Sequence, residues 1–323
     1  MNTQRRRYLG MGVAGTLAAF ATTRMAWADA VSVGSAFDTL DLDWADAARQ
    51  RAVPVRLYLP KFEARMPLVV FSHGIGGSRR GYSWLGQHFA RSGIACLHVQ
   101  HVGSDRALWM GSIFGLVERL QGAAQSQEAV ARVQDLRFAL DTLLAGELAG
   151  RFDRQRIVAA GHSYGANTAL LASGARASRD GVVVELADAR VRAAIVISAP
   201  PFYGESDPSR ILASVAVPSL HVTTTEDVIR IPGYFSAAED RVKVFEATGG
   251  ARKWLAVYEG GSHSMFTDRL GAGGATLNPR VKLATQGLVL AFLRGVFDGD
   301  DSALAAWPQQ HTELLARFTA PRA

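Results

Sequence analysis

Ser163 is the residue of this sequence whose surroundings most clearly favour chemistry. It is the centre of GHSYG at 161–165, which lies between a short apolar run at 157–160 and good helix formers at 166–172. A sharp strand-to-helix turn exposes a serine hydroxyl in a strained conformation, and glycines on both sides let neighbouring backbone approach closely. The pattern therefore predicts that Ser163 is a nucleophile.

Two further residues could activate this serine. Acyl transfer needs a base that takes the hydroxyl proton and an acid that orients the base. His263 lies in a glycine-rich loop after the last strong strand pattern, and Asp227 follows the strand pattern before it. The order serine, aspartate, histidine is typical of a parallel sheet that carries such a serine turn. We predict Asp227 as the acid and His263 as the base, with the adjacent Glu226 as the alternative acid.

A second glycine-rich segment, HGIGG at 73–77, also follows an apolar run. A dinucleotide fingerprint would need a glycine where Arg79 stands, so that interpretation fails. Such a loop can instead bring backbone N–H groups close to the negative oxygen of a tetrahedral intermediate. We predict the N–H groups of Ile75 and Tyr164 as the oxyanion donors, and we expect His73 to brace the loop.

The rest of the chain alternates between strand and helix patterns. Strands are expected at 53–60, 67–73, 94–101, 157–160, 191–198, 217–224 and 253–258. Helices are expected at 81–92, 127–144, 166–172 and 281–297. Continuous apolar runs are typical of strands buried on both faces of a parallel sheet. The sequence predicts an α/β fold, with a doubly wound, mostly parallel sheet flanked by helices, in one domain over 31–323.

Apolar residues near the expected strand ends suggest how a substrate would bind. Trp109 and Phe114 belong to an apolar segment at 104–127, which we predict as a lid or pocket wall, with ordinary core packing as the alternative. Phe202 lies in a proline-rich loop that could border the same site. These three residues are the predicted substrate contacts. They favour an acyl or aromatic ester over a highly charged substrate.

The first thirty residues have the order of a bacterial export signal. Arginines are followed by an apolar run of 13 residues and then by a small-x-small cleavage pattern. The arginine pair before Tyr8 resembles a twin-arginine signal, which predicts export by that machinery to the periplasm or the medium, with an uncleaved anchor as the alternative. Four of the 35 basic residues lie in 1–28, and the remaining 31 nearly balance 29 acidic residues. The charge therefore does not indicate nucleic acid binding.

The sequence does not indicate a disulfide, a metal site or a bound cofactor. Cys96 is the only cysteine, so the chain cannot form an internal disulfide. The aspartate-rich DGDD at 298–301 lacks the spacing of a calcium loop. We expect neither a metal nor an organic cofactor.

Four segments resemble the α/β-hydrolase superfamily, and within it the exported dienelactone-hydrolase-like esterases, the platelet-activating-factor acetylhydrolases and the polyester-cleaving cutinases. These segments are FSHGIGG at 71–77, AGHSYGANTALLA at 160–172, TTTEDVIRIP at 223–232 and GGSHSMF at 260–266. The resemblance implies the same roles for Ser163, Asp227, His263, Ile75 and Tyr164.

The chain also departs from each of these groups. Dienelactone hydrolases proper use a cysteine nucleophile, and bacterial cutinases usually have a disulfide. The acetylhydrolases place the acid after an earlier strand, where this chain has SAPPFYG at 198–204 without a carboxylate. The sequence predicts a serine esterase acting on a small or lipid-like ester. The alternatives are an acyltransferase or peptidase with the same residues, or a hydrolase-fold binding protein without activity.

Overall fold

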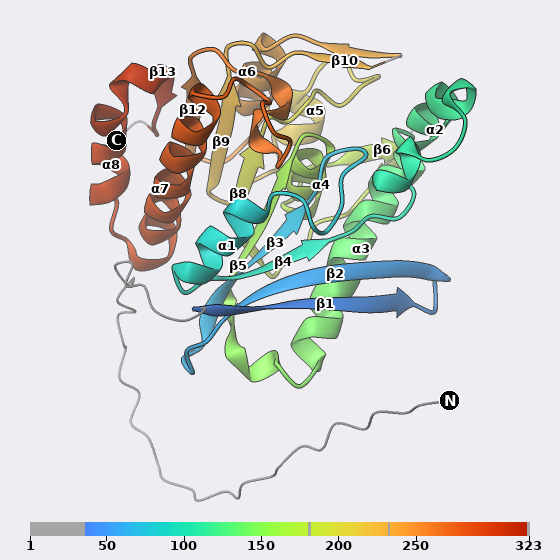
Figure 1. The fold of residues 1–323 in the computed structure, drawn as a ribbon, viewed down its shortest axis with the longest axis horizontal. Coiled ribbons are helices and arrows are strands. Elements are labelled where there is room, and N and C mark those ends of the chain that lie inside the picture. Colours follow the sequence, from blue (N-terminus) through green and yellow to red (C-terminus); the bar gives the residue numbers. More distant parts are fainter. Residues whose placement is uncertain (1–35, 180–181, 232, 322–323) are drawn as a thin grey trace, which may run out of the picture.

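The computed structural model describes residues 36–179, 182–231 and 233–321, so the predicted export signal at 1–30 lies outside it. A nine-stranded sheet forms its centre, in the order β1-β2-β4-β3-β5-β8-β9-β12-β13 (Figure 1). The strands are β1 (Phe37–Asp46), β2 (Arg51–Pro60), β3 (Met66–Ser72), β4 (Ala95–Val99), β5 (Phe152–His162), β8 (Val191–Ile197), β9 (Ser219–Thr224), β12 (Lys253–Tyr258) and β13 (Leu315–Thr319).

Most of this sheet is parallel. The strands from β4 across to β12 pair in parallel, whereas the β1–β2 hairpin and β13 pair antiparallel at the two edges. Every residue of β3 is buried, as expected for a strand covered on both faces. The predicted fold class is therefore confirmed. The edge strands β1 and β13 were not predicted, because half-exposed edge strands lack a continuous apolar run.

Helices cover both faces of the sheet. One apolar cluster joins it to α3 (Ser126–Ala145), α4 (Tyr164–Ala172), α5 (Ser209–Leu212) and α6 (Glu239–Ala247). A second cluster joins it to α1 (Ser83–Arg91), α7 (Leu277–Asp298) and α8 (Ser302–Gln310). Leu68 of β3 belongs to the first cluster and Val69 to the second, because successive side chains of a strand point to opposite faces. The sheet therefore lies between two apolar layers.

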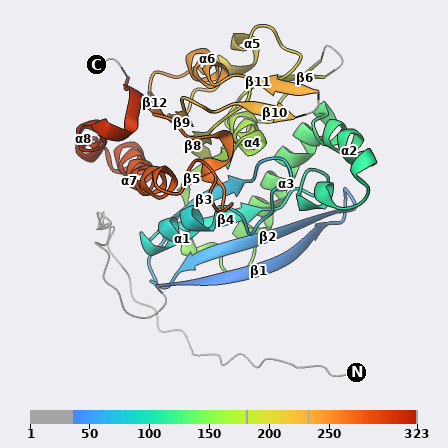
Figure 2. The same ribbon diagram turned by 45° about the horizontal axis from the view of Figure 1, so that its top comes forward.

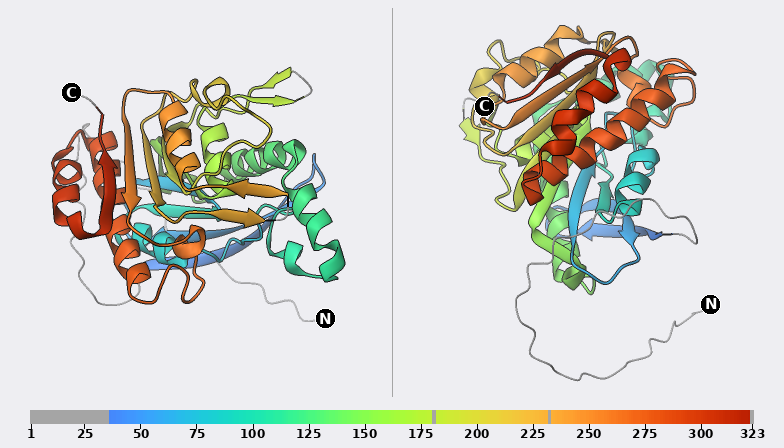
Figure 3. Two further views of the ribbon diagram at one scale, coloured as in Figure 1. Left: turned by 90° about the horizontal axis from the view of Figure 1, so that it is seen from above. Right: turned by 90° about the vertical axis from the view of Figure 1, so that its left-hand side faces the viewer.

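A smaller group of elements lies beyond one end of the strands. The hairpin of β10 (Ile229–Ile231) and β11 (Tyr234–Ser236) lies beside α2 (Leu116–Ala123) (Figures 2 and 3). Ile231 packs against Leu108 and Leu120 in a small apolar cluster. The remaining elements are β6 (Ala177–Arg179), β7 (Val182–Val184) and the short 3-10 helices η1 (Arg106–Trp109), η2 (Ile113–Gly115), η3 (Ala149–Arg151), η4 (His263–Phe266) and η5 (Thr312–Leu314). In the described part of the chain no helix is long and apolar enough to cross a membrane.

The turn between β5 and α4 contains Ser163 in an unusual backbone conformation. Its φ is 55° and its ψ is −126°, which L-residues rarely adopt. The Ser163 N–H donates to the Ile197 carbonyl at 2.9 Å, and this bond ties the turn to β8. A side chain at Gly165 would lie closer than 3.0 Å to the Ser72 carbonyl oxygen, and one at Gly161 would clash with the carbonyl of Gly165. Glycine at both positions is required for this turn.

We expect Gly165→Ala to destabilise the protein by about 3 kcal/mol or more, because a rigid backbone carbonyl occupies the space of the new methyl group. The matched control is Gly122→Ala in α2. Apart from its chain neighbours and the backbone of its own helix, no atom lies within 4 Å of the position that the new methyl group would occupy. Alanine favours a helix by about 0.5–1 kcal/mol over glycine, so the control should not destabilise. Urea unfolding of both variants measures the difference, and equal stability of the two would contradict this explanation of the turn.

Candidate active site

Ser163, His263 and Asp227 lie in one hydrogen-bonded chain, although 100 residues separate the first two. Ser163 Oγ lies 2.8 Å from His263 Nε2, and His263 Nδ1 lies 2.7 Å from Asp227 Oδ1. Ser163 follows β5, Asp227 follows β9, and His263 follows β12, so parallel strand ends bring all three to one edge of the sheet. Because a carboxylate only accepts, His263 Nδ1 carries a proton and its Nε2 can accept the serine proton. Glu226, the alternative acid, is exposed.

Asp227 is buried, and several partners keep it ionised. Burial by itself raises the pKa of this carboxyl group, but the hydrogen bond and charge of His263, with the charge of Arg241, outweigh that effect and lower the pKa below its usual range. Thr223 Oγ1 donates to Asp227 Oδ2 at 2.7 Å. Arg241 Nη2 lies 3.2 Å from Asp227 Oδ1, with side chains 2% and 0% exposed. The Asp227 carboxylate is thus fixed from three directions.

His162 links the serine turn to the loops on either side of it. Burial lowers its pKa to about 3, so the ring is neutral, with one donor and one acceptor nitrogen. His162 Nε2 donates to the His263 carbonyl at 2.9 Å, and Nδ1 accepts from the Tyr82 hydroxyl at 2.9 Å. The Tyr82 oxygen in turn accepts from the Gly74 N–H at 3.2 Å. This bridge connects the glycine-rich loop, the serine turn and the loop that holds His263.

The two predicted oxyanion donors lie beside Ser163. Gly74 is so close to the serine that a side chain on it would lie 3.1 Å from Ser163 Cβ. Ile75 follows Gly74 and, like Ser163, lines two neighbouring cavities, one of which Tyr164 also lines. Among the described turns and loops, the Ile75 N–H donates no backbone hydrogen bond. Tyr164 is the first residue of α4, and the first N–H groups of an α-helix have no partner within the helix. Both N–H groups are free to bind an oxygen.

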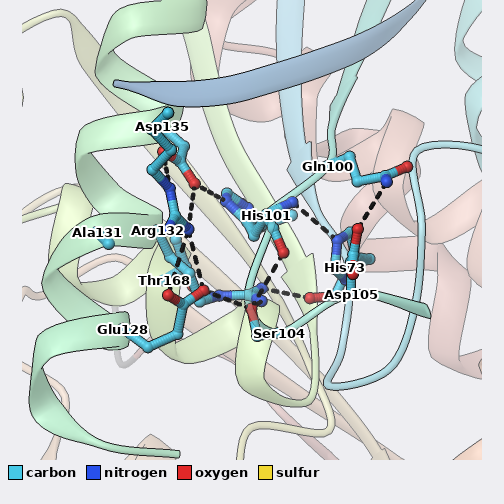
Figure 4. Close-up of polar contacts among 12 residues, drawn as sticks. His73, Gln100, His101, Ser104, Asp105, Glu128, Ala131, Arg132, Asp135 and Thr168 are labelled. Atoms are coloured by element: carbon cyan, nitrogen blue, oxygen red, sulfur yellow. Dashed lines mark hydrogen bonds and ion pairs between the residues drawn. The ribbon is translucent and has the colours of Figure 1, made fainter. Parts of the chain in front are cut away.

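A buried polar network lies behind the glycine-rich loop (Figure 4). His73 Nδ1 donates to the Gly74 carbonyl at 2.7 Å, and His73 Nε2 accepts from the His101 N–H at 3.1 Å. His101 Nδ1 donates to Asp135 Oδ2 at 3.1 Å, and its Nε2 accepts from the Ser72 hydroxyl at 3.0 Å. Burial lowers the pKa of both histidines well below the usual range. His73 braces the loop in this arrangement.

Two cavities meet at Ser163. The larger, of about 750 Å³, is lined by His162, His263 and Trp109, and the smaller, of about 460 Å³, is lined by Tyr164 and Phe202. Two of the three predicted substrate contacts therefore lie at the site, one in each cavity. The third, Phe114, is 94% exposed and lines neither of them, although Ala124 and Ser126 of the same segment line the smaller cavity. The described residues contain no cluster of three or more His, Cys, Asp or Glu side chains that could hold a metal ion.

Three buried residues near the site were missed by sequence reasoning. Arg241 comes from α6, Tyr82 precedes α1, and Arg132 lies within α3. Arg132 carried a readable signal, because it lies four residues before Leu136 on the apolar face of the predicted helix, where a charge is unexpected. Arg241 and Tyr82 have no comparable signal, since only the fold brings them to the site.

We expect Asp227→Asn to destabilise the protein by about 3 kcal/mol, because it leaves the charge of Arg241 buried without a carboxylate. Arg241→Gln should destabilise less when combined with Asp227→Asn than alone. Urea unfolding of both single variants and the double variant measures this coupling. The exposed pair of Arg280 and Glu313 provides the control, since Arg280→Gln should cost less than about 1 kcal/mol. If the double variant lost as much free energy of unfolding as the two single variants together, the coupling between Asp227 and Arg241 would be contradicted.

Comparison with known proteins agrees with this architecture. Residues 69–322 match the alpha/beta hydrolase family. A ferulic acid esterase from Streptomyces cinnamoneus shares the fold, with a TM-score of 0.60, 23% identity and coverage of 85% of this chain and 94% of that one. A cold-adapted esterase from an Arctic intertidal metagenomic library has a TM-score of 0.53, with 17% identity and coverage of 80% and 99%. The search of curated proteins found no match. The family match spans most of the chain, and this protein belongs to the α/β-hydrolase family.

Proposed function

We propose that this protein is a serine hydrolase that cleaves carboxylic esters through an acyl-serine intermediate. The observation that supports this most directly is the hydrogen-bonded chain from Ser163 Oγ through His263 to Asp227, at distances of 2.8 and 2.7 Å. Membership of the α/β-hydrolase family and the similarity of the fold to two esterases agree with the proposal. Ser163 is the nucleophile, His263 the base, and Asp227 the acid that orients it.

In the first half-reaction, Ser163 Oγ attacks the ester carbonyl carbon while His263 Nε2 takes the serine proton. The carbonyl electron pair moves to the oxygen, which the N–H groups of Ile75 and Tyr164 stabilise. The bond from carbon to the alcohol oxygen then breaks, and His263 gives its proton to that oxygen. In the second half-reaction, His263 takes a proton from water, the hydroxide attacks the acyl carbon, and Ser163 leaves with the proton.

This chemistry fixes the orientation of the substrate. The alcohol must leave on the side of His263, which lines only the larger cavity. The oxyanion points to the Ile75 and Tyr164 N–H groups, so the acyl group extends into the smaller cavity. Apolar side chains of α3, α4 and the loop after β8 line much of that space, among them Ala129, Val130, Leu171 and Phe202. We propose an apolar acyl group there.

The alcohol side has a different character. The larger cavity is lined by four exposed charged residues, Arg106, Arg230, Asp268 and Arg269, and by Trp109. We propose that a polar alcohol is accepted there, so the substrate class is an ester of an apolar acid with a polar alcohol.

Two finer expectations also remain proposals. The likeness to dienelactone-hydrolase-like and acetylhydrolase-like esterases rests on the four sequence segments around the site. Export by the twin-arginine machinery rests on residues 1–30.

Labelling of the purified protein with a fluorophosphonate probe tests the proposed function, together with hydrolysis of p-nitrophenyl esters. We expect labelling and turnover in the natural protein and loss of both in Ser163→Ala, because Ser163 is hydrogen-bonded to His263 and lines both cavities. The hydroxyl groups of Ser72 and Ser219 also contact a histidine ring, but both residues are buried and line neither cavity. Ser264→Ala, next to the base, is the control for losing a nearby hydroxyl and should still be labelled. A folded natural protein that is neither labelled nor active would refute the proposal.

A pair of cavity-filling variants tests the orientation. Ala129→Phe should lower kcat/KM for decanoate esters at least tenfold relative to acetate esters, because the new ring fills the acyl cavity. Ser78→Phe, which lines only the larger cavity, should instead discriminate against bulky alcohols at constant acyl length. Both series are read from initial rates. The opposite assignment of the two effects would show that the substrate binds in reverse.

A further inference from the structure

The geometry points to Arg132 as a positioning residue that holds both oxyanion donors, Ile75 and Tyr164, in place from behind. This inference rests on the proposed function, which needs the two N–H groups to converge on one oxygen. The two donors come from different segments, the loop after β3 and the start of α4. Arg132, on α3, contacts both segments (Figure 4). Its side chain is 0% exposed.

Arg132 is hydrogen-bonded to the backbone of the glycine-rich loop before Ile75, and through Ser104 to the backbone after it. Its Nη2 donates to the carbonyl of His73, two residues before Ile75. Its Nη1 donates to Ser104 Oγ at 2.7 Å, and the Ser104 carbonyl accepts from the N–H of Gly76 at 2.8 Å. The backbone on each side of the Ile75 donor is therefore held through the same guanidinium group.

On the serine side, Arg132 acts on Tyr164. The centre of the guanidinium group lies 4.5 Å from the centre of the Tyr164 ring, within the range of a cation–π contact. Arg132 Nε donates to Thr168 Oγ1 at 2.9 Å, and Thr168 Oγ1 donates to the Tyr164 carbonyl at 3.0 Å. Both contacts fix the first turn of α4, where the second donor lies.

The chemistry of arginine suits this position. A planar guanidinium group offers five N–H donors in a fixed arrangement, whereas the single ammonium group of lysine cannot reach three acceptors in these directions. Burial lowers the pKa of Arg132 to about 10, so the group remains protonated at neutral pH. Glu128, which accepts from Ser104 Oγ at 2.8 Å, is the nearby countercharge. One rigid group thereby sets the relative position of two donors, as preorganised stabilisation requires.

The same network contains a matched control residue. Arg49 also contributes a charge to it, with Nη1 2.9 Å from Asp135 Oδ1 and its Nε bound to Asp46. Within the described part of the chain, its hydrogen-bond and ion-pair partners are Asp46, Ala131 and Asp135, which lie outside the glycine-rich loop and α4. Arg49→Met therefore removes a charge from the network without touching the donors, and Arg132→Met removes one that holds them.

The test measures kcat and KM for a p-nitrophenyl ester, and the inhibition constant of a trifluoromethyl ketone, whose tetrahedral adduct has an oxyanion. We expect Arg132→Met to lower kcat about 10- to 100-fold relative to Arg49→Met, with KM changed less than threefold, because misplaced donors act only in the transition state. The inhibition constant should rise by the factor lost in kcat/KM. Arg132→Lys should recover less than a tenth of the lost kcat, since lysine keeps the charge but lacks the planar set of N–H donors.

A milder variant answers the question if Arg132→Met does not fold. Thr168→Val keeps the shape of the side chain and removes the hydroxyl group that links Arg132 to the Tyr164 carbonyl. It should lower kcat about 3- to 10-fold. Its control is Thr285→Val, a buried threonine of α7 that also donates to a carbonyl four residues earlier, at 2.8 Å. Thr285→Val should leave kcat within twofold of the natural protein.

The outcomes separate the inference from the proposed function. If the natural protein hydrolyses esters but Arg132→Met matches Arg49→Met, or Thr168→Val matches Thr285→Val, the inference is wrong. A rise in KM at constant kcat would also overturn it, because that would mean a role in substrate binding. If the natural protein hydrolyses no ester and Ser163 is not labelled, the proposed function fails and this inference falls with it.

Discussion

The strained turn at Ser163 is the constraint on which the rest of the structure depends. A non-glycine residue in such a conformation costs on the order of 1–3 kcal/mol and persists only where its surroundings over-determine it. Here the turn is fixed by two glycines that admit neighbouring carbonyls, by the bond to Ile197 and by the burial of α4. The parallel sheet supplies the rigid frame that keeps these contacts in register.

Positioning by backbone contacts recurs throughout the site. His162 and Tyr82 connect three loops through one neutral imidazole and one hydroxyl. The network behind the glycine-rich loop fixes the carbonyl groups of His73 and Gly74. His162, Tyr82 and Gly74 line the larger cavity, so the shape of its wall depends on buried polar contacts behind it.

The sequence made the central part of this fold predictable because its signals are local. Apolar runs marked the buried parallel strands, and GHSYG marked the turn that follows β5. Asp227 and His263 could be selected because parallel strands end at one edge, so chain order implies proximity. The edge strands and the β10–β11 hairpin had no such pattern. Phe114 illustrates the limit of composition, since an aromatic residue near a strand end can still point into solvent. Arg241 and Tyr82 reach the site only through tertiary packing, which no short segment encodes.

The neutral imidazoles described above have a consequence for the electrostatics of the whole protein. Six of its eight histidines, His73, His88, His98, His101, His162 and His221, have pKa values that burial lowers. Imidazole is the side chain that ordinarily changes charge between about pH 5 and 8. Burial lowers the pKa of His88 and lowers the pKa of the other five rings far enough that they are uncharged in this range. His73, His101 and His162, the rings that brace the site, therefore keep the directions of their hydrogen bonds across neutral pH.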